Sequence, residues 1–133
     1  MRLLTVSVAA MAGIAAAALA LPVTAAPAGD AAAGKKVFMR CAACHTVSAS
    51  GPQKMGPTMA GVVGRKAGTA KDARYSPALA KSALVWNEKN LDAWLLRPSK
   101  VVPGTSMAFA GIADEKQRRD LDDVIGTSAE PDL

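Results

Sequence analysis

The chain has 133 residues and a net charge of +5, with two cysteines, one histidine and few aromatic residues. This length allows one domain. The basic residues do not form Lys-rich runs interleaved with aromatics, so we expect no nucleic-acid partner. With two cysteines and one histidine, a four-ligand zinc site would need carboxylate ligands, and no spacing indicates them.

The N-terminal residues have the pattern of a secretory signal peptide. Arg2 provides a short positive region, and an uncharged, Ala-rich apolar run extends from Leu3 to Leu21. Small residues follow, so we predict a signal peptide over residues 1–25, with cleavage as late as residue 28, and export to the periplasm. The apolar run approaches the length that spans a bilayer, so an uncleaved membrane anchor is the alternative. Cleavage leaves 15 basic and 11 acidic residues, a net charge of +4.

The first helix of the mature chain is predicted to begin after Asp30, a good N-cap residue. Gly34, Val37, Phe38 and Cys41 recur at helical spacing and form one face that runs into the cysteine motif. Glycine inside a helix costs about 1 kcal/mol relative to alanine. We therefore expect another helix to approach closely at Gly34.

The segment Cys41-Ala-Ala-Cys44-His45 places two thiols and an imidazole at the spacing of covalent haem attachment. Each thiol can form a thioether with one haem vinyl group, and His45 can coordinate the iron. The same cysteine spacing occurs in thiol–disulfide redox pairs. The βαβ pattern that normally surrounds such a pair is missing, so haem attachment is the favoured interpretation and a thiol–disulfide role the alternative.

Residues 46–76 show no strand alternation and are punctuated by glycine and proline, which predicts a long loop. A loop of this length suits a compact domain if it wraps a prosthetic group. A short helix is predicted over residues 77–84.

Two later helices are marked by capping residues. Asn87 is predicted to begin a helix that ends at Pro98 and shares one face among Leu91, Trp94 and Leu95. After a second loop over residues 103–107, Asp114 and Gln117 give a capping-box-like start to the last helix. Leu121, Val124 and Ile125 form its apolar stripe, Gly126 is expected to end it, and residues 126–133 are predicted to be a flexible tail.

Over residues 29–125, which we interpret as one domain, the chain resembles class I cytochromes c, most closely the bacterial c2 and mitochondrial-type subgroup. The matching motifs are Gly29-Asp30, Gly34 with Phe38, Cys41 to His45, Gly56-Pro57, Gly64 to Gly68, Tyr75, Trp86, Leu91 to Pro98 and Pro103 to Gly111. The resemblance implies an all-α fold with loops wrapped around one covalently attached haem c. The N- and C-terminal helices would cross, with Gly34 and Phe38 against Leu121 and Val124.

The resemblance also implies His45 and Met107 as the two axial iron ligands. The carbonyl of Pro57 would accept a hydrogen bond from the other nitrogen of His45. Three residues match family positions that hydrogen-bond or neutralise the haem propionates: Arg65, Tyr75 and Trp86. We expect Thr105 to contact the propionates as well. Trp94, at a position where the family usually has tyrosine, would point inward toward the haem pocket near Met107, and Val124 replaces an aromatic residue at the helix crossing.

Filling both axial positions leaves no vacant site for substrate or oxygen, so the resemblance implies a one-electron carrier and not an enzyme. The expected partners are a membrane reductase complex or periplasmic dehydrogenase, and a terminal oxidase or photosynthetic reaction centre. We expect a monomer that docks transiently through a basic face that includes Lys35, Arg40, Lys54 and Lys100. Ser106 and Asp114 stand where relatives often have lysine. The alternatives are a dedicated cytochrome subunit of one dehydrogenase and a haem sensor.

Overall fold

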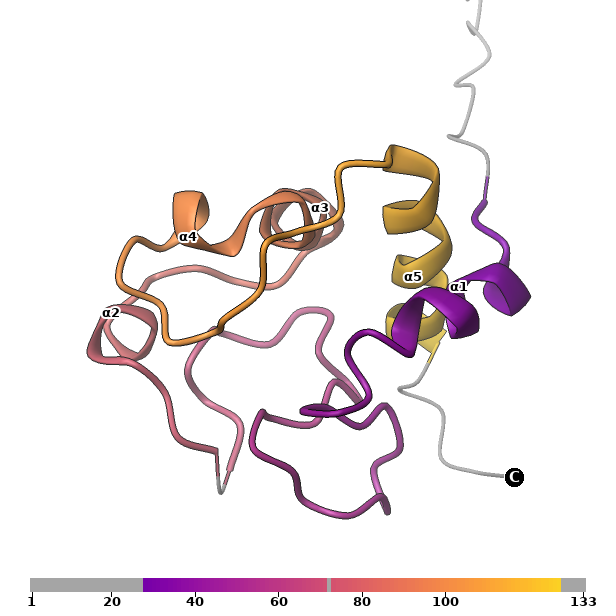
Figure 1. Ribbon diagram of the computed structural model, residues 1–133. Coiled ribbons are helices and arrows are strands. Elements are labelled where there is room, and N and C mark those ends of the chain that lie inside the picture. The colour runs from indigo at the N-terminus through magenta and orange to yellow at the C-terminus, as the bar shows by residue number, and fades with distance from the viewer. Residues whose placement is uncertain (1–27, 72, 128–133) are drawn as a thin grey trace, which may run out of the picture.

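Helices and long connecting segments make up the described part of the chain (Figure 1). The computed structural model describes residues 28–71 and 73–127. Its helices are α1 (Ala31–Phe38), α2 (Pro77–Ala80), α3 (Glu88–Leu96), α4 (Pro98–Val101) and α5 (Glu115–Thr127). These residues form no strand, only an isolated antiparallel bridge between Lys66 and Val85. The predicted all-α architecture is confirmed.

The helix α1 begins where the sequence predicts. The Asp30 carboxylate accepts hydrogen bonds from the backbone N–H groups of Ala32 and Ala33, at 2.9 and 3.1 Å. These bonds satisfy two of the N–H groups that a first helical turn leaves unpaired. The periodicity predicts one helix into the cysteine motif, but α1 ends at Phe38. Beyond it the Cys41 N–H donates to the Phe38 carbonyl at 2.8 Å, which is the tighter three-residue pattern.

The crossing of α1 and α5 is a contact between backbones. A Cβ atom built on Gly34 would lie 1.9 Å from the Asp120 carbonyl oxygen and 2.7 Å from a Val124 methyl group. Figure 1 shows the two helices side by side at this point. Glycine is therefore required for the approach, and the close contact expected at Gly34 is confirmed. Leu121 is fully buried on α5.

The helix α3 presents Leu91, Trp94 and Leu95 to the core, as its periodicity predicts. The Asn87 side chain caps it by accepting a hydrogen bond from the Asn90 N–H at 2.8 Å. Pro98 ends α3 but also begins α4, a short helix that the sequence pattern does not predict. Proline suits this position because the first residue of a helix needs no N–H partner.

The long loop of residues 46–76 is held by backbone hydrogen bonds to the segment before α3. The Gly64 N–H donates to the Trp86 carbonyl at 2.7 Å, and the Trp86 N–H donates to the Arg65 carbonyl at 2.9 Å. The Ala67 N–H donates to the Leu84 carbonyl at 2.8 Å. This pairing explains why α2 ends at Ala80, short of the predicted residue 84. The chain there is extended alongside the loop.

The predicted signal peptide and its cleavage site lie outside the described residues, as do residues 128–133 of the predicted tail. At the C-terminal end, α5 continues through Gly126 to Thr127 and so extends past the expected stop. Among the helices described in residues 28–71 and 73–127, none has the length and apolar character needed to cross a membrane.

Candidate functional site

The cysteine motif forms a compact turn at the end of α1. The N–H groups of Cys44 and His45 both donate to the Cys41 carbonyl, at 3.0 and 2.9 Å. Cys41 is buried in the core, whereas Cys44 is half-buried. The turn therefore holds the two thiols and the imidazole within one short segment beside the core.

The His45 ring is fixed by the loop that follows the motif. Its Nδ1 lies 2.8 Å from the Pro57 carbonyl oxygen. Because a carbonyl can only accept, Nδ1 carries the proton and donates, which leaves Nε2 as the nitrogen able to bind a metal. The hydrogen bond predicted between these two residues is therefore present.

Gly56 allows the loop to approach the imidazole. A Cβ atom on Gly56 would lie 2.4 Å from Cε1 of His45, so any larger residue would displace the ring or the loop. The Gly56 N–H also donates to the Cys44 carbonyl at 2.8 Å. The Gly56-Pro57 pair thus sets both the distance and the orientation of His45. The hydrogen bond to Pro57 was predicted, whereas the need for glycine at position 56 was not.

The surroundings of the thiols argue against the thiol–disulfide alternative. Burial raises the pKa of the Cys41 thiol, and the nearby Arg40 charge offsets this only in part. Redox-active cysteine pairs rely on a lowered pKa, because the thiolate is the reactive form. The zinc alternative also has no support in residues 28–71 and 73–127, where no group of three or more His, Cys, Asp and Glu residues could hold a metal ion.

Met107 lies on the loop that runs from α4 to α5. It is half-buried and packs against the buried cluster, and its N–H donates to the Thr105 hydroxyl at 3.3 Å. Met39 and Met55 are instead exposed, by 71% and 80%. Met59 packs against the core, but its N–H donates to the Thr46 carbonyl, next to His45. Among these methionines, Met107 is the one that both reaches the core and comes from a segment remote from His45.

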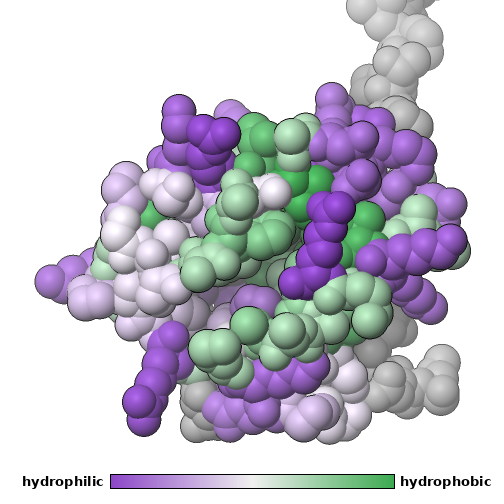
Figure 2. All heavy atoms as spheres, viewed as in Figure 1, coloured by the Kyte–Doolittle hydropathy of each residue, from purple (hydrophilic) through white to green (hydrophobic). Residues whose placement is uncertain are grey.

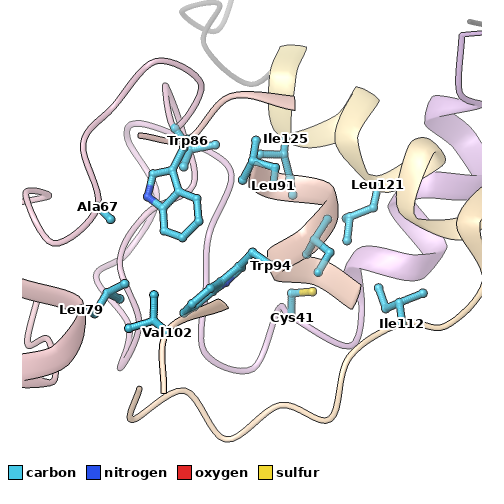
Figure 3. Close-up of a cluster of buried hydrophobic side chains, with 12 residues drawn as sticks. Cys41, Ala67, Leu79, Trp86, Leu91, Trp94, Val102, Ile112, Leu121 and Ile125 are labelled. Atoms are coloured by element: carbon cyan, nitrogen blue, oxygen red, sulfur yellow. The ribbon is translucent and has the colours of Figure 1, made fainter. Parts of the chain in front are cut away.

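Two tryptophans, Trp86 and Trp94, pack against each other in the buried core, and we call this pair the aromatic wall. Trp86 and Trp94 are almost fully buried, and their ring centroids lie 5.1 Å apart with the edge of one ring toward the other. Figure 3 shows both indoles, Leu79 and Val102 gathered around a common space, with Cys41 on the other side of Trp94. The inward orientation expected for Trp94 is confirmed. Leu79 and Val102 were missed as wall residues, because isolated apolar residues in short segments show no periodicity.

Tyr75 and Arg65 have partners in the structure that the sequence does not predict. The Tyr75 hydroxyl accepts a hydrogen bond from the Ala70 N–H at 3.2 Å, which leaves its own proton available to donate. The Arg65 guanidinium donates to the carbonyls of Thr58 and Ala60, at 2.7 and 3.1 Å. Arg65 therefore holds the long loop together, and its remaining N–H groups are left for an anionic ligand.

These features fit a haem attached through the thiols of Cys41 and Cys44. Its iron would be held by a nitrogen of His45 and by the sulfur of Met107, which lie on segments distant along the chain. The cytochrome c family model matches residues 31–124. The chain belongs to the cytochrome c family. It therefore carries one haem c, attached covalently through Cys41 and Cys44, and acts as a monohaem electron carrier with the class I fold.

Relatives named cytochrome c, cytochrome c2 and cytochrome cH match about three quarters of this chain or slightly less. Cytochrome c of Tetrahymena pyriformis is 49% identical over 96 residues, which are 71% of this chain and 85% of the relative. Cytochrome c2 of Rhodoblastus acidophilus is 43% identical over 94 residues, 71% of this chain and 88% of the relative. The solved structure of cytochrome cH from Methylobacterium extorquens shares 47% identity, with a TM-score of 0.69 over 74% of this chain and 99% of that one.

Proposed function

We propose that the protein is a periplasmic one-electron carrier in which His45 and Met107 are the axial ligands of the haem iron. It would take electrons from a membrane reductase complex or a periplasmic dehydrogenase. It would pass them to a terminal oxidase or a photosynthetic reaction centre. The bound haem supplies reversible one-electron chemistry, and the chain holds it, tunes it and presents it to partners.

The hydrogen bond from His45 Nδ1 to the Pro57 carbonyl is the observation that carries this proposal. It fixes the tautomer with Nε2 unprotonated, and it raises the basicity of the ring as a ligand. Met107 offers a soft thioether from the α4–α5 loop, which favours the reduced state and raises the reduction potential. An iron held by both His45 and Met107 would have no open position for substrate, which suits the site to electron transfer alone.

Carbon monoxide binding tests the axial assignment. The reduced protein should leave the gas unbound at neutral pH, because Met107 occupies the sixth position. Met107→Ala should bind carbon monoxide and show a lower reduction potential. The matched control is Met55→Ala, which removes an exposed methionine and should change neither property. An unchanged potential and no gas binding in Met107→Ala would assign the sixth ligand to another residue.

The predicted docking residues come from separate elements. Lys35 lies on α1, Arg40 follows it and Lys100 lies on α4; all three are exposed. Figure 1 places α1 and α4 at opposite sides of the view, and Figure 2 shows hydrophilic side chains around apolar residues on this face. The Lys54 ammonium instead donates to the Ala42 carbonyl, so it also braces the cysteine motif.

An open apolar groove adjoins Lys100. Its lining consists of Ala93, Leu96, Arg97, Lys100 and Val101. Leu96 is 44% exposed, so apolar contact can add to charge attraction in this region. We propose that acidic groups of a partner contact the exposed cations named above, while an apolar residue of the partner packs near Leu96. Interfaces commonly combine an apolar centre with a polar rim in this way.

Ionic strength and added charge test the docking face. Electron transfer to an acidic partner should slow as salt rises, and Ser106→Lys should speed it at low salt. Ala83→Lys makes the same charge change on an exposed residue that is not among the proposed docking residues, and it should have a smaller effect. Rates that do not vary with salt would show that docking does not use these charges.

The periplasmic location rests on the N-terminal sequence pattern. N-terminal sequencing of the mature haem protein from an osmotic-shock fraction should find a first residue between about 26 and about 29. Recovery of the haem protein only in membranes, with Met1 retained, would establish the anchored form. Affinity capture of the reduced and oxidised protein from periplasm and membranes would then identify the partners.

A further inference from the structure

The seam between α3 and α5 contains charged side chains from both helices. Arg118 of α5 is buried there, with 7% of its side chain exposed. Its Nε donates to the Asp92 carboxylate of α3 at 2.6 Å. Its Nη1 donates to the carbonyls of Ile112 and Ala113, both at 2.9 Å. Arg118 is therefore committed to Asp92 and to the start of α5.

Asp122 lies one helical turn after Arg118 on the same side of α5. Its Oδ1 is buried and has no hydrogen-bond partner among the residues that the structure describes. The charges acting on it are Asp92 and Glu88 of α3 and Arg118 and Asp123 of α5. Three of these four are negative, and the single positive one is already paired. Packing of α1 involves the other face of α5, which carries Asp120 and Val124.

Asp122 is half-buried, with one oxygen shielded from solvent and without a donor in the described part of the chain. Such a carboxylate is costly when ionised and less so when protonated. Burial is the largest cause that raises the pKa of Asp122 to about 7, followed by repulsion from Asp92 and Glu88. We propose that protonation of the Asp122 carboxyl controls how tightly α3 packs against α5. The neutral carboxyl sits in the seam without repulsion, whereas the ionised one is driven away from the carboxylates of α3.

This packing affects the aromatic wall because α3 carries Trp94, which is buried and packs edge to face against Trp86. We call the seam closed when α3 packs against α5 and open when the two helices separate. The pKa of Asp122 is raised in the closed form, so the closed form is most stable at pH values below 3.8, the ordinary pKa of an aspartate. This stability falls as the pH rises toward about 7 and then levels off, because Asp122 is ionised in both the open and the closed forms. The wall that holds Trp94 should therefore open more often at neutral than at mildly acid pH.

A direct test is carboxyl carbon NMR on the reduced protein with its haem attached. The Asp122 signal should titrate with a midpoint at about 7, while exposed carboxyls titrate near about pH 4. A midpoint below about pH 5 would overturn the proposal.

Hydrogen exchange of the α3 amides gives a second measurement, after correction for the intrinsic pH dependence of exchange. Protection at Leu91 to Leu95 should fall by up to about tenfold per pH unit between about pH 5 and about pH 7. Asp122→Asn has the shape of the neutral carboxyl and should remove this fall. Asp123→Asn makes the same charge change one residue later and should keep it. Retention of the fall in Asp122→Asn, or its loss in Asp123→Asn, would contradict the proposal.

Discussion

The helix α5 contacts α1 on one side and α3 on the other, and two of its aspartates experience opposite environments. Asp120, toward α1, accepts the Asp30 N–H at 2.9 Å and the Lys116 ammonium at 2.7 Å. These hydrogen bonds, from Lys116 first and then Asp30, hold the pKa of Asp120 below its usual range. Asp122, toward α3, has a buried oxygen without a donor among the described residues, and its pKa is raised.

The comparison shows that burial alone does not decide whether a carboxylate stabilises a helix contact. Only 5% of the Asp120 side chain is exposed, yet its partners make it favourable when ionised. A buried carboxylate that lacks donors repels its neighbours and favours the protonated form. The α1–α5 contact is therefore expected to strengthen with ionisation and the α3–α5 contact to weaken.

The largest expected effect comes from disturbing the α1–α5 contact at Gly34. Gly34→Ala places a Cβ atom 1.9 Å from the Asp120 carbonyl oxygen, so the two backbones must separate. We expect a loss of about 3 kcal/mol or more in the free energy of unfolding, measured by denaturant titration. Gly126→Ala is the control. It lies in α5 with open space around it and should stabilise the protein by about 0.5–1 kcal/mol. Equal effects of the two changes would refute the close crossing.

On the α3 side, Trp94→Phe should remove packing without removing a ligand. Trp94 is 6% exposed and contacts Trp86 edge to face, so the smaller ring leaves a cavity. We expect thermal or denaturant unfolding to show a loss of about 1–3 kcal/mol, with the reduction potential nearly unchanged. Leu96→Ala, on the exposed side of the same helix, should cost less. A large shift in potential at unaltered stability would instead indicate that the indole interacts with an iron ligand.

A smaller effect, opposite in sign for the two aspartates, is expected from removing their charges. The pKa of Asp120 is lowered in the folded protein. Its contribution to the free energy of unfolding is therefore fully present at pH values above the ordinary aspartate pKa of 3.8, and it is lost as the pH falls through the pKa of the folded protein. Asp120→Asn should therefore destabilise the protein at neutral pH and reduce its sensitivity to acid. Asp122→Asn should stabilise it at neutral pH. Urea unfolding at several pH values measures both, and a common sign would contradict the assigned environments.

The smallest effect should come from an exposed ion pair on α5. Glu115 and Arg119 pair at helical spacing with side chains 71% and 37% exposed. Glu115→Gln should change the free energy of unfolding by no more than about 0.5 kcal/mol, because solvent screens the pair. Lys116→Met breaks a pair of the same spacing whose carboxylate is buried, and it should cost more. If the two variants unfold alike, burial of Asp120 adds nothing to its pair.

The sequence predicted the start of every long helix because its signals are local. Asp30, Asn87 and Asp114 each accept a backbone hydrogen bond within three residues along the chain. The sequence also predicted the close approach at Gly34, because glycine within a helix lowers its stability unless a tight packing contact requires it. It failed at the ends of α1, α2 and α5 and at α4. The chain after α1 tightens into local three-residue bonds, the chain after α2 pairs with the distant long loop, and α4 depends on a proline start.

For the candidate site, the sequence by itself determined the chemistry of haem attachment: two thiols and an imidazole at fixed spacing. These follow from residue identity and spacing, which any fold must respect. Met107 was singled out from the other methionines through the family resemblance. The tertiary structure decided what each group contacts, such as the bonds of Arg65 to the Thr58 and Ala60 carbonyls and the partners of Asp120. It also left Asp122 without a donor among the described residues. Two aspartates two residues apart look alike in sequence, because hydrogen bonding and burial depend on segments that are distant along the chain.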